Sequence, residues 1–335
     1  CPSIEDKVVR FSTQNSHSLF LEPEWAGSDQ IYLGGFSTSM PENVQIACLK
    51  AIKAFKNIEF IRPGYAIEYD YIPTYQLKST LESKEIDNLY CAGQINGTSG
   101  YEEAAAQGLM AGANAALKIL NKDPFVIKRD EGYVGVLIDD LVTKSINEPY
   151  RMFTSRAEYR LSLRPDNVYE RLSKRAFESG LITKDLYNKC LDLFNMEGVF
   201  SKKISNQKID DGGKKTRLVH FLKRPQSSIF DFITPKGKIE SFSLYSLETK
   251  IKYDGYIKIE RKRAEKVASF ENSHIPPSFN YSKIANLSSE ALEKLDLVQP
   301  ETIAQASRID GVSRSDISSL CLFLHSKGFI VSRET

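Results

Sequence analysis

A glycine- and alanine-rich segment at residues 92–117 constrains this chain more than any other part of its sequence. A short apolar run at 88–92 leads into Gly93, Gly97 and Gly100, and an alanine-rich stretch follows. This order predicts a strand, a turn whose backbone a ligand can approach, and a helix. Because a helix N-terminus has unpaired N–H groups and the positive end of the helix dipole, it suits an anion such as a phosphate.

Small residues recur every four positions along the predicted helix, at Ala104, Gly108 and Gly112. This spacing places them on one face, which we expect to lie close against a sheet or a cofactor. The glycine spacing G-x-x-x-G-x-x-G differs from the dinucleotide fingerprint G-x-G-x-x-G. The spacing alone therefore leaves a second interpretation open, in which the turn only precedes a tightly packed core helix.

Four separated blocks, taken in order, resemble the GidA/MnmG family, the flavoprotein subunit of the tRNA wobble-uridine modification system. The blocks are CPSIEDK at 1–7, RPGYAIEYD at 62–70, the glycine segment at 92–108, and YRMFTSRAEYR at 150–160. The resemblance runs from residue 1 to the last predicted helices and is weak only at about 200–275. Family members have a preceding half that carries the G-x-G-x-x-G flavin fingerprint and a second redox-relevant cysteine. We therefore expect this chain to correspond to the C-terminal half of such a protein.

The resemblance implies an activity for the intact protein. It uses FAD and NADH, and together with the GTPase MnmE it adds an aminomethyl or carboxymethylaminomethyl group to C5 of the wobble uridine. Methylene-tetrahydrofolate supplies the one-carbon unit, and glycine or ammonium the amine. The implied partners are tRNA, MnmE and a second copy, giving a heterotetramer. Two alternatives stay open: a folate- and FAD-dependent tRNA uracil-C5 methyltransferase, and a non-catalytic remnant that only binds tRNA or a partner.

The resemblance also assigns site residues. Cys1 matches a catalytic cysteine, although a lone cysteine is more often an inert small hydrophobe. Gln94 would contact the FAD, and Glu68 lies in a block that borders the flavin site. The alternative for Gln94 and Asn96 is that they only satisfy the turn backbone. The residues implied to shape the flavin pocket are Asn96, Gly97, Gly100 and Tyr101.

An arginine series is the second candidate site. If 150–164 is helical, Arg156, Arg160 and Arg164 lie on one face, with no carboxylate among their neighbours on that helix. Stacked like charges favour an external anion, and guanidinium groups bind phosphates well. Pairing with acids elsewhere in the fold is the alternative. The resemblance implies that this region binds tRNA, so we expect these arginines, together with Arg151, to contact tRNA phosphates.

The bulk properties limit the class of protein. A length of 335 residues allows two or three domains, and a net charge of +2 does not by itself demand a nucleic-acid partner. No apolar run approaches bilayer length, and no secretory signal opens the chain. The five cysteines are widely spaced without a C-x-x-C pair, and the four histidines show no ligand spacing. We therefore expect a cytoplasmic protein without membrane span, disulfide framework or metal.

The expected fold class is an α/β N-terminal part, an incomplete FAD/NAD-binding Rossmann-like domain, followed by mostly α-helical domains. The expected domains are 1–125 for the dinucleotide-binding part, 126–275 for a helical tRNA-binding region with a mixed insert, and 276–335 for a small helical domain that contacts MnmE or tRNA.

Asp139 and Asp140 are expected to cap a helix or face solvent. The other expected elements are strands at 8–11 and 19–22, a helix at 41–55 capped by Ser39, extended segments at 58–61 and 66–71, a helix from 135, a loop at 210–213, and a helix at the capping box of Ser313 and Asp316.

Overall fold

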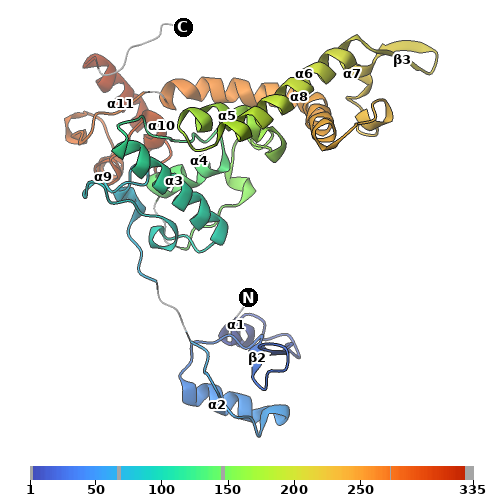
Figure 1. Ribbon diagram of the computed structural model, residues 1–335. Helices are drawn as coiled ribbons and strands as arrows, with labels where there is room; N and C mark the ends of the chain where they lie inside the picture. Colours follow the sequence, from blue (N-terminus) through green and yellow to red (C-terminus); the bar gives the residue numbers. More distant parts are fainter. Residues whose placement is uncertain (1–2, 66–68, 145–147, 272, 329–335) are drawn as a thin grey trace. The chain divides into compact units, whose positions relative to one another are not determined.

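A short α/β unit precedes a larger helical one in the computed structural model, which describes residues 3–65, 69–144, 148–271 and 273–328 (Figure 1). The chain divides between Asp70 and Tyr71 into two compact units. This division was not among the boundaries expected from the sequence. Cys1 and Glu68, two of the expected site residues, lie outside the described residues.

The first unit begins with a helix where a strand was expected. Helix α1 spans Ile4–Val9, and the Ser3 side chain caps it by accepting from the Asp6 N–H at 3.2 Å. This cap and the acidic residues of the first turn favour a helix over the predicted strand at 8–11, which was therefore wrong. Strands β1, Phe20–Pro23, and β2, Ile31–Gly34, pair antiparallel, which confirms the strand expected near 19–22.

The helix expected at 41–55 is confirmed in its first part. Helix α2 spans Glu42–Ala51, and a 3₁₀ turn, η1, follows at Lys53–Phe55. Ser39 does not cap it, because Pro41 occupies the N-cap position and no side chain bonds there. The segment at 58–61 forms no strand.

The second unit opens with 3₁₀ turns and two helices that share one core. The turns are η2, Thr74–Gln76, and η3, Gly93–Asn96, and the helices are α3, Tyr101–Ile119, and α4, Tyr133–Thr143. Both helices were expected from the sequence. Their core includes Leu77, Leu81, Cys91, Met110, Leu117, Phe125, Ile138 and Val142.

The expected strand at 88–92 is absent, and the residues that the structure describes form no parallel sheet. Asn88 has a positive φ of 66°, and Tyr90 makes only an isolated bridge to Glu82. Over the described ranges the sheets are two antiparallel hairpins, β1–β2 and one in the helical region. The Rossmann-like domain expected for 1–125 therefore stays a prediction.

Residues 150–164 do not form the expected helix. They contain a single 3₁₀ turn, η4, at Thr154–Arg156, and a second turn, η5, at Pro165–Asn167, leads into α5, Val168–Glu178. Backbone N–H groups of the segment donate hydrogen bonds to residues far away in the sequence. Tyr150 N–H donates to Gly97 O at 2.8 Å, and Ser162 N–H donates to the Glu260 carboxylate at 3.0 Å. These tertiary contacts outweigh the helical spacing of the sequence.

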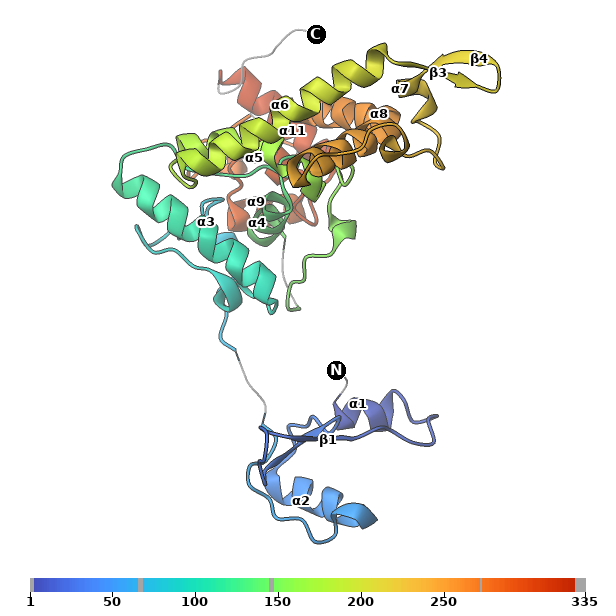
Figure 2. The ribbon, with the colours of Figure 1, turned by 45° about the vertical axis from the view of Figure 1, so that its right-hand side comes forward.

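Two long helices dominate the middle of the chain. Figures 1 and 2 show α6, Lys184–Asn206, beside α8, Lys238–Glu271, with the β3–β4 hairpin at the far end of this region. The hairpin, Lys208–Asp211 and Lys214–Arg217, turns at the loop expected at 210–213. After the hairpin come a short α-helix, α7, Leu218–Phe221, and a 3₁₀ turn, η6, Ile229–Asp231. The shared core includes Phe200, Ile204, Leu218, Leu222, Ile229, Ile233, Leu244, Leu247 and Ile251.

The C-terminal helices have a core of their own. They are α9, Ser289–Val298, α10, Ile303–Ala306, and α11, Arg314–Ser326, after a 3₁₀ turn, η7, at Tyr281–Lys283. The expected capping box is confirmed, since Ser313 and Asp316 bond reciprocally at the start of α11. The core includes Ile275, Tyr281, Leu295, Val298, Ile303, Leu320 and Leu324. None of the helices described is long and apolar enough to cross a bilayer.

Candidate functional site

The glycine segment forms a hydrogen-bonded turn just before α3. Gly93 and Gly97 have φ values of 82° and 73°, a region that residues with a Cβ adopt only at a cost. A Cβ on Gly93 would also lie 3.3 Å from the Cβ of Ala104, so the turn packs directly on the helix. Gly97 ends η3, with its N–H bonded to Gln94 O at 2.9 Å. The predicted turn before a helix is therefore confirmed.

A buried amide network holds this turn in place. Asn96 Nδ2 donates to Cys91 O and to Gln107 Oε1, both at 2.8 Å, and Gln107 Oε1 also accepts from Gly93 N–H at 3.1 Å. Gln107 Nε2 donates to Thr98 Oγ1 at 2.9 Å, and that hydroxyl donates to Gly93 O. Asn96, Thr98 and Gln107 are all fully buried. Asn96 thus hydrogen-bonds to backbone next to the turn, and its place in a flavin pocket stays a prediction.

Of the other expected flavin residues, Gln94, Gly97 and Tyr101 lie nearer the surface, whereas Gly100 is buried. Gln94 and Gly97 are half-buried, and the Gln94 side chain has no hydrogen bond among the contacts described. Gly100 is the N-cap of α3 and offers no side chain, so the first turn of the helix has no side-chain cap. Tyr101 is 93 % exposed, and its ring therefore borders open solvent in this chain. A Cβ placed on the buried Gly100 would collide with the Glu103 carboxylate. Gln94 and Gly97 remain the residues at which a ligand could meet the turn.

One face of α3 carries small residues and is not covered by other parts of the described chain. A Cβ placed on Gly108 or Gly112 would meet no atom within 4 Å, and the nearby Leu109 and Ile119 are exposed. Ala104 contacts the turn, whereas the two glycines lead away from it along the open face. The close packing expected for this small-residue face is therefore made only at Ala104.

Segment 150–164 lies next to the glycine turn. Thr98 and Tyr150 form a parallel bridge, and the Glu103 carboxylate accepts from Met152 N–H at 2.9 Å. The arginines of the segment consequently belong to the same neighbourhood as the start of α3. Their side chains, however, do not share one face.

The four expected tRNA-binding arginines divide into two kinds. Arg164 is nearly buried and forms a two-pronged ion pair with Asp166, at 3.0 and 3.1 Å. Arg156 lies over the Tyr150 ring, 4.5 Å from its centre, and donates to Arg151 O. Arg151 and Arg160 are exposed and make no side-chain ion pair in the described part of the chain. Arg156 also lies 3.9 Å from the Asp140 carboxylate. The alternative of internal pairing thus holds for Arg164 and Arg156, and Arg151 and Arg160 are available to an external anion.

A buried charge cluster behind this segment was missed. Arg129, 6 % exposed, binds Asp139 at 3.0 Å, Asp140 at 2.7 Å and Glu158 at 2.6 Å. Burial alone would raise the pKa of Asp140, but hydrogen bonds and charge from Lys144 and Arg129 hold that pKa below its usual value. Asp139 also accepts from Arg308, which ties the cluster to the C-terminal helices.

The expectation that Asp139 and Asp140 cap a helix or face solvent was wrong. Both carboxylates are largely removed from solvent and form ion pairs with Arg129, which precedes helix α4 in the sequence. The Tyr150 hydroxyl donates to Asp140 at 2.8 Å, and burial, reinforced by this carboxylate, raises the pKa of Tyr150. The cluster is a structural brace for the 150–158 segment, because every charge within it is paired.

Cys91 is the cysteine nearest to the glycine turn, and it is buried. This burial raises the pKa of Cys91, so its thiolate is disfavoured. No group of three or more His, Cys, Asp or Glu with metal-site geometry occurs among the residues described.

The chain matches two family models. Residues 1–123 match the model described as glucose inhibited division protein A, and residues 263–333 match the tRNA modifying enzyme MnmG/GidA C-terminal helical bundle.

Full-length relatives extend the match across the intervening region. The chain is 45 % identical to the tRNA uridine 5-carboxymethylaminomethyl modification enzyme MnmG of Christiangramia forsetii, over 97 % of this chain and 56 % of that protein. It is 49 % identical to the enzyme of the same name from Mycoplasmopsis synoviae, over 97 % and 54 %. Its structure superposes on Aquifex aeolicus GidA with a TM-score of 0.80 and 42 % identity, covering 97 % of this chain and 54 % of that one. The chain thus spans about half the length of the relatives it matches.

Proposed function

This chain belongs to the GidA/MnmG family, and on that premise we propose that it forms part of a cytoplasmic, FAD-dependent enzyme that modifies C5 of the wobble uridine of tRNA. The observation that carries the proposal is the preformed glycine turn beside an open helix face. Hydrogen bonds of Asn96 and Gln107 already hold the turn in one conformation. Binding of a ligand to this turn therefore loses little further conformational entropy.

The residues present fit one wall of a flavin site. Gly97 allows close approach to the backbone, and Gly108 and Gly112 leave room that a Cβ would fill. In the proposal, Gln94 orients the cofactor, and Glu68 and Tyr101 border it. The remaining polypeptide of the relatives would supply the opposite wall and cover the face of α3. FAD, reduced by NADH, supplies hydride chemistry when bound.

The proposed partners follow the family resemblance. Arg151 and Arg160 would bind tRNA phosphates, with Arg156 and Arg164 positioning their segment through Tyr150 and Asp166. Cys1 would act as the catalytic cysteine, and methylene-tetrahydrofolate would donate the carbon unit. The C-terminal domain at 276–335 would contact MnmE, and two copies would form a heterotetramer with it. The methyltransferase alternative is not favoured, because the matched relatives are named as carboxymethylaminomethyl-modifying enzymes.

The test is reconstitution with the polypeptide that the Christiangramia forsetii relative has beyond the match. We expect the combined protein to bind FAD and, with MnmE, to produce an aminomethyl or carboxymethylaminomethyl uridine detectable by mass spectrometry of digested tRNA. Gln94→Ala should lower flavin occupancy, and Arg151→Ala with Arg160→Ala should weaken tRNA binding. Flavin-loaded protein that makes 5-methyluridine, or no modified uridine at all, would contradict the proposal.

A further inference from the structure

The positive charge of this chain is concentrated in one region. Residues 200–251, here called the insert lobe, contain the end of α6, the β3–β4 hairpin, α7, η6 and the first half of α8. Its stretch 201–240 holds ten lysines and arginines against four acids, an excess of six positive charges in a chain whose net charge is only +2. The rest of the molecule is therefore net negative, and an anionic partner would be attracted to the lobe.

The four acidic side chains of this stretch form hydrogen bonds or ion pairs with residues of the same stretch. Asp211 pairs with Arg224, Asp210 accepts from Gly213 N–H in the hairpin turn, and Glu240 accepts from Lys236 N–H at 2.8 Å. Asp231 belongs to the capping box of η6. Lys223 pairs with Asp254 outside the stretch. The other lysines of the stretch have no ion-pair partner among the described residues, so their charge is available to another molecule.

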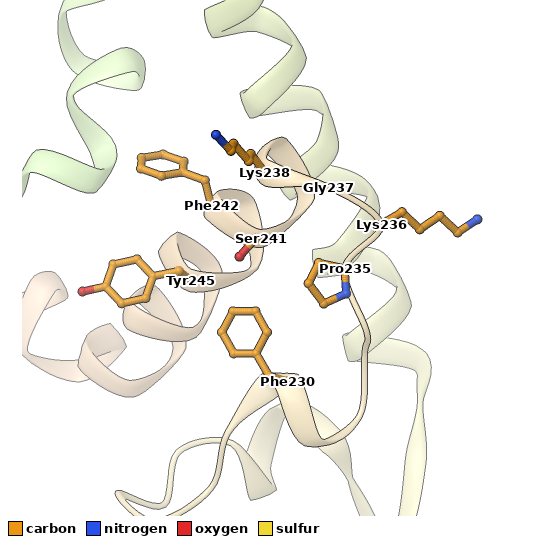
Figure 3. Close-up of a pocket in the computed structure, with 8 residues that line it drawn as sticks. All are labelled: Phe230, Pro235, Lys236, Gly237, Lys238, Ser241, Phe242 and Tyr245. Carbon is orange, nitrogen blue, oxygen red and sulfur yellow. The ribbon is translucent and has the colours of Figure 1, made fainter.

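A groove with aromatic walls lies within the same lobe. Its volume is about 710 Å³, and Figure 3 shows Phe230, Pro235 and Tyr245 around Ser241, with Phe242 beside them. Phe230, Phe242 and Tyr245 are 38 %, 39 % and 57 % exposed, although the lobe has a separate hydrophobic core. The Phe242 ring packs against Tyr169, with ring centres 6.2 Å apart. Phe230 and Tyr245 are not part of the core and line the groove with exposed rings.

Two lysines stand at the rim of the groove. Figure 3 shows Lys236 and Lys238 on either side of Gly237, with their ammonium groups extending outward. Neither ammonium has an ion-pair partner among the described residues, whereas Lys250 and Lys252 further along α8 are paired with Glu197 and Glu248. The rim therefore carries two available positive charges directly beside accessible aromatic rings.

Aromatic faces beside free cations are the chemistry that binds unpaired nucleic acid, because bases stack on rings while lysines contact phosphates. A protein partner fits less well, since lysine is depleted from the cores of protein interfaces. We propose that the insert lobe carries an RNA-binding subsite, in which the groove stacks an unpaired base and Lys236 and Lys238 bind the flanking phosphates. The subsite is separate from the glycine turn and from Arg151 and Arg160. It rests on the proposed function only for the identity of the RNA as tRNA.

The experiment measures binding of the full chain to a tRNA transcript and to a short oligouridylate, by fluorescence anisotropy over a series of salt concentrations. The first variant is Lys236→Ala with Lys238→Ala, and the second is Tyr245→Ala. The matched control is Lys184→Ala with Lys189→Ala, which removes two exposed, unpaired lysines from the other end of α6. Circular dichroism confirms that each variant is folded.

For the oligouridylate, we expect the rim variant to lower affinity roughly tenfold and the slope of log affinity against log salt by about 1 to 1.5, because each phosphate contact to a single strand contributes about 0.7. Tyr245→Ala should lower affinity about fivefold with little change in slope, since stacking is not ionic. The control should change neither quantity. The tRNA should respond in the same direction.

Wild-type oligouridylate binding by either the rim variant or Tyr245→Ala would overturn the subsite, as would an equal loss in the control. These outcomes do not depend on the modification reaction. If the reconstituted enzyme fails to modify tRNA while both variants weaken RNA binding, the proposed function fails and the subsite stands.

Discussion

At the scale of single residues, the glycine turn is held by a few buried amides. Gln107 lies at the centre, since its two side-chain atoms reach Gly93, Asn96, Thr98 and the Glu103 carbonyl. Its position could have been noticed in the sequence, as Gln107 falls on the same face of the predicted helix as Met110, Ala111 and Asn114, all of which are buried. A glutamine on an apolar helix face must find partners, and the turn is the nearest source of unpaired backbone groups.

Gln107→Leu should therefore destabilise the second unit by about 3 kcal/mol, because Gly93 N–H and one Asn96 donor lose their acceptor in a dry environment. The measurement is urea unfolding followed by circular dichroism. Gln94→Leu is the matched control, since Gln94 is half-buried without a side-chain hydrogen bond among the described contacts, and it should change stability by less than about 0.5 kcal/mol. Equal effects of the two substitutions would show that the network does not hold the turn.

Glu82 should make the second unit sensitive to acid. Burial would raise its pKa, but hydrogen bonds from Lys118, Asn88 N–H and Lys78 outweigh this and lower the pKa from 4.5 to about 2. Because the folded-state pKa is the lower one, this contribution is present above about pH 4.5 and is lost as the pH falls toward 2. We expect a loss on the order of 1 kcal/mol after allowance for solvent screening at the partly exposed lysines.

The check is urea unfolding at a series of pH values. Glu82→Gln should lower stability at neutral pH and make the acid dependence shallower by a similar amount. Glu85→Gln provides the control, because Glu85 is exposed and has no ion pair in the described structure. An unchanged pH profile in Glu82→Gln would refute the assignment.

At the scale of elements, the sequence predicts helices well where composition and end signals agree. Helices α3 and α4 and the capping box of α11 were anticipated because their residues carry local information. The segment 150–164 was misjudged because its N–H groups bond to Gly97 and Glu260, which no local pattern reveals. The Arg129 cluster was missed for the same reason, since its members come together only in the fold.

The capping box at α11 leads to a graded prediction. Asp316 is the larger contributor, as it accepts from Ser313 N–H at 2.9 Å and also from Ser288 N–H at 2.8 Å, which joins α11 to the start of α9. Asp316→Ala should cost about 3 kcal/mol and Ser313→Ala about 1 kcal/mol. Ser318→Ala, on the exposed side of the same helix, should be nearly neutral. Urea unfolding of the three variants tests the order, and a Ser318 effect as large as that of Ser313 would contradict it.

At the scale of the whole molecule, burial is distributed very unevenly between the two units. All five clusters of buried hydrophobic residues lie within 71–335. Among the described residues of 1–70, Leu49 is the single hydrophobic side chain that is buried, and Phe20, Leu21, Trp25 and Tyr32 are exposed. A segment of this size buries too little apolar surface to offset its loss of conformational entropy.

Residues 71–335 expressed alone should therefore unfold cooperatively at nearly the same temperature as the full chain, whereas residues 1–70 alone should show no cooperative transition. The stability of the larger fragment rests on cores that the cut leaves complete, including the link from Ser79 to Glu301 at 2.7 Å. Differential scanning calorimetry of both fragments and the full chain measures this directly. A sharp transition in 1–70, or its absence in 71–335, would mean that the buried cores identified here do not account for the stability of the fold.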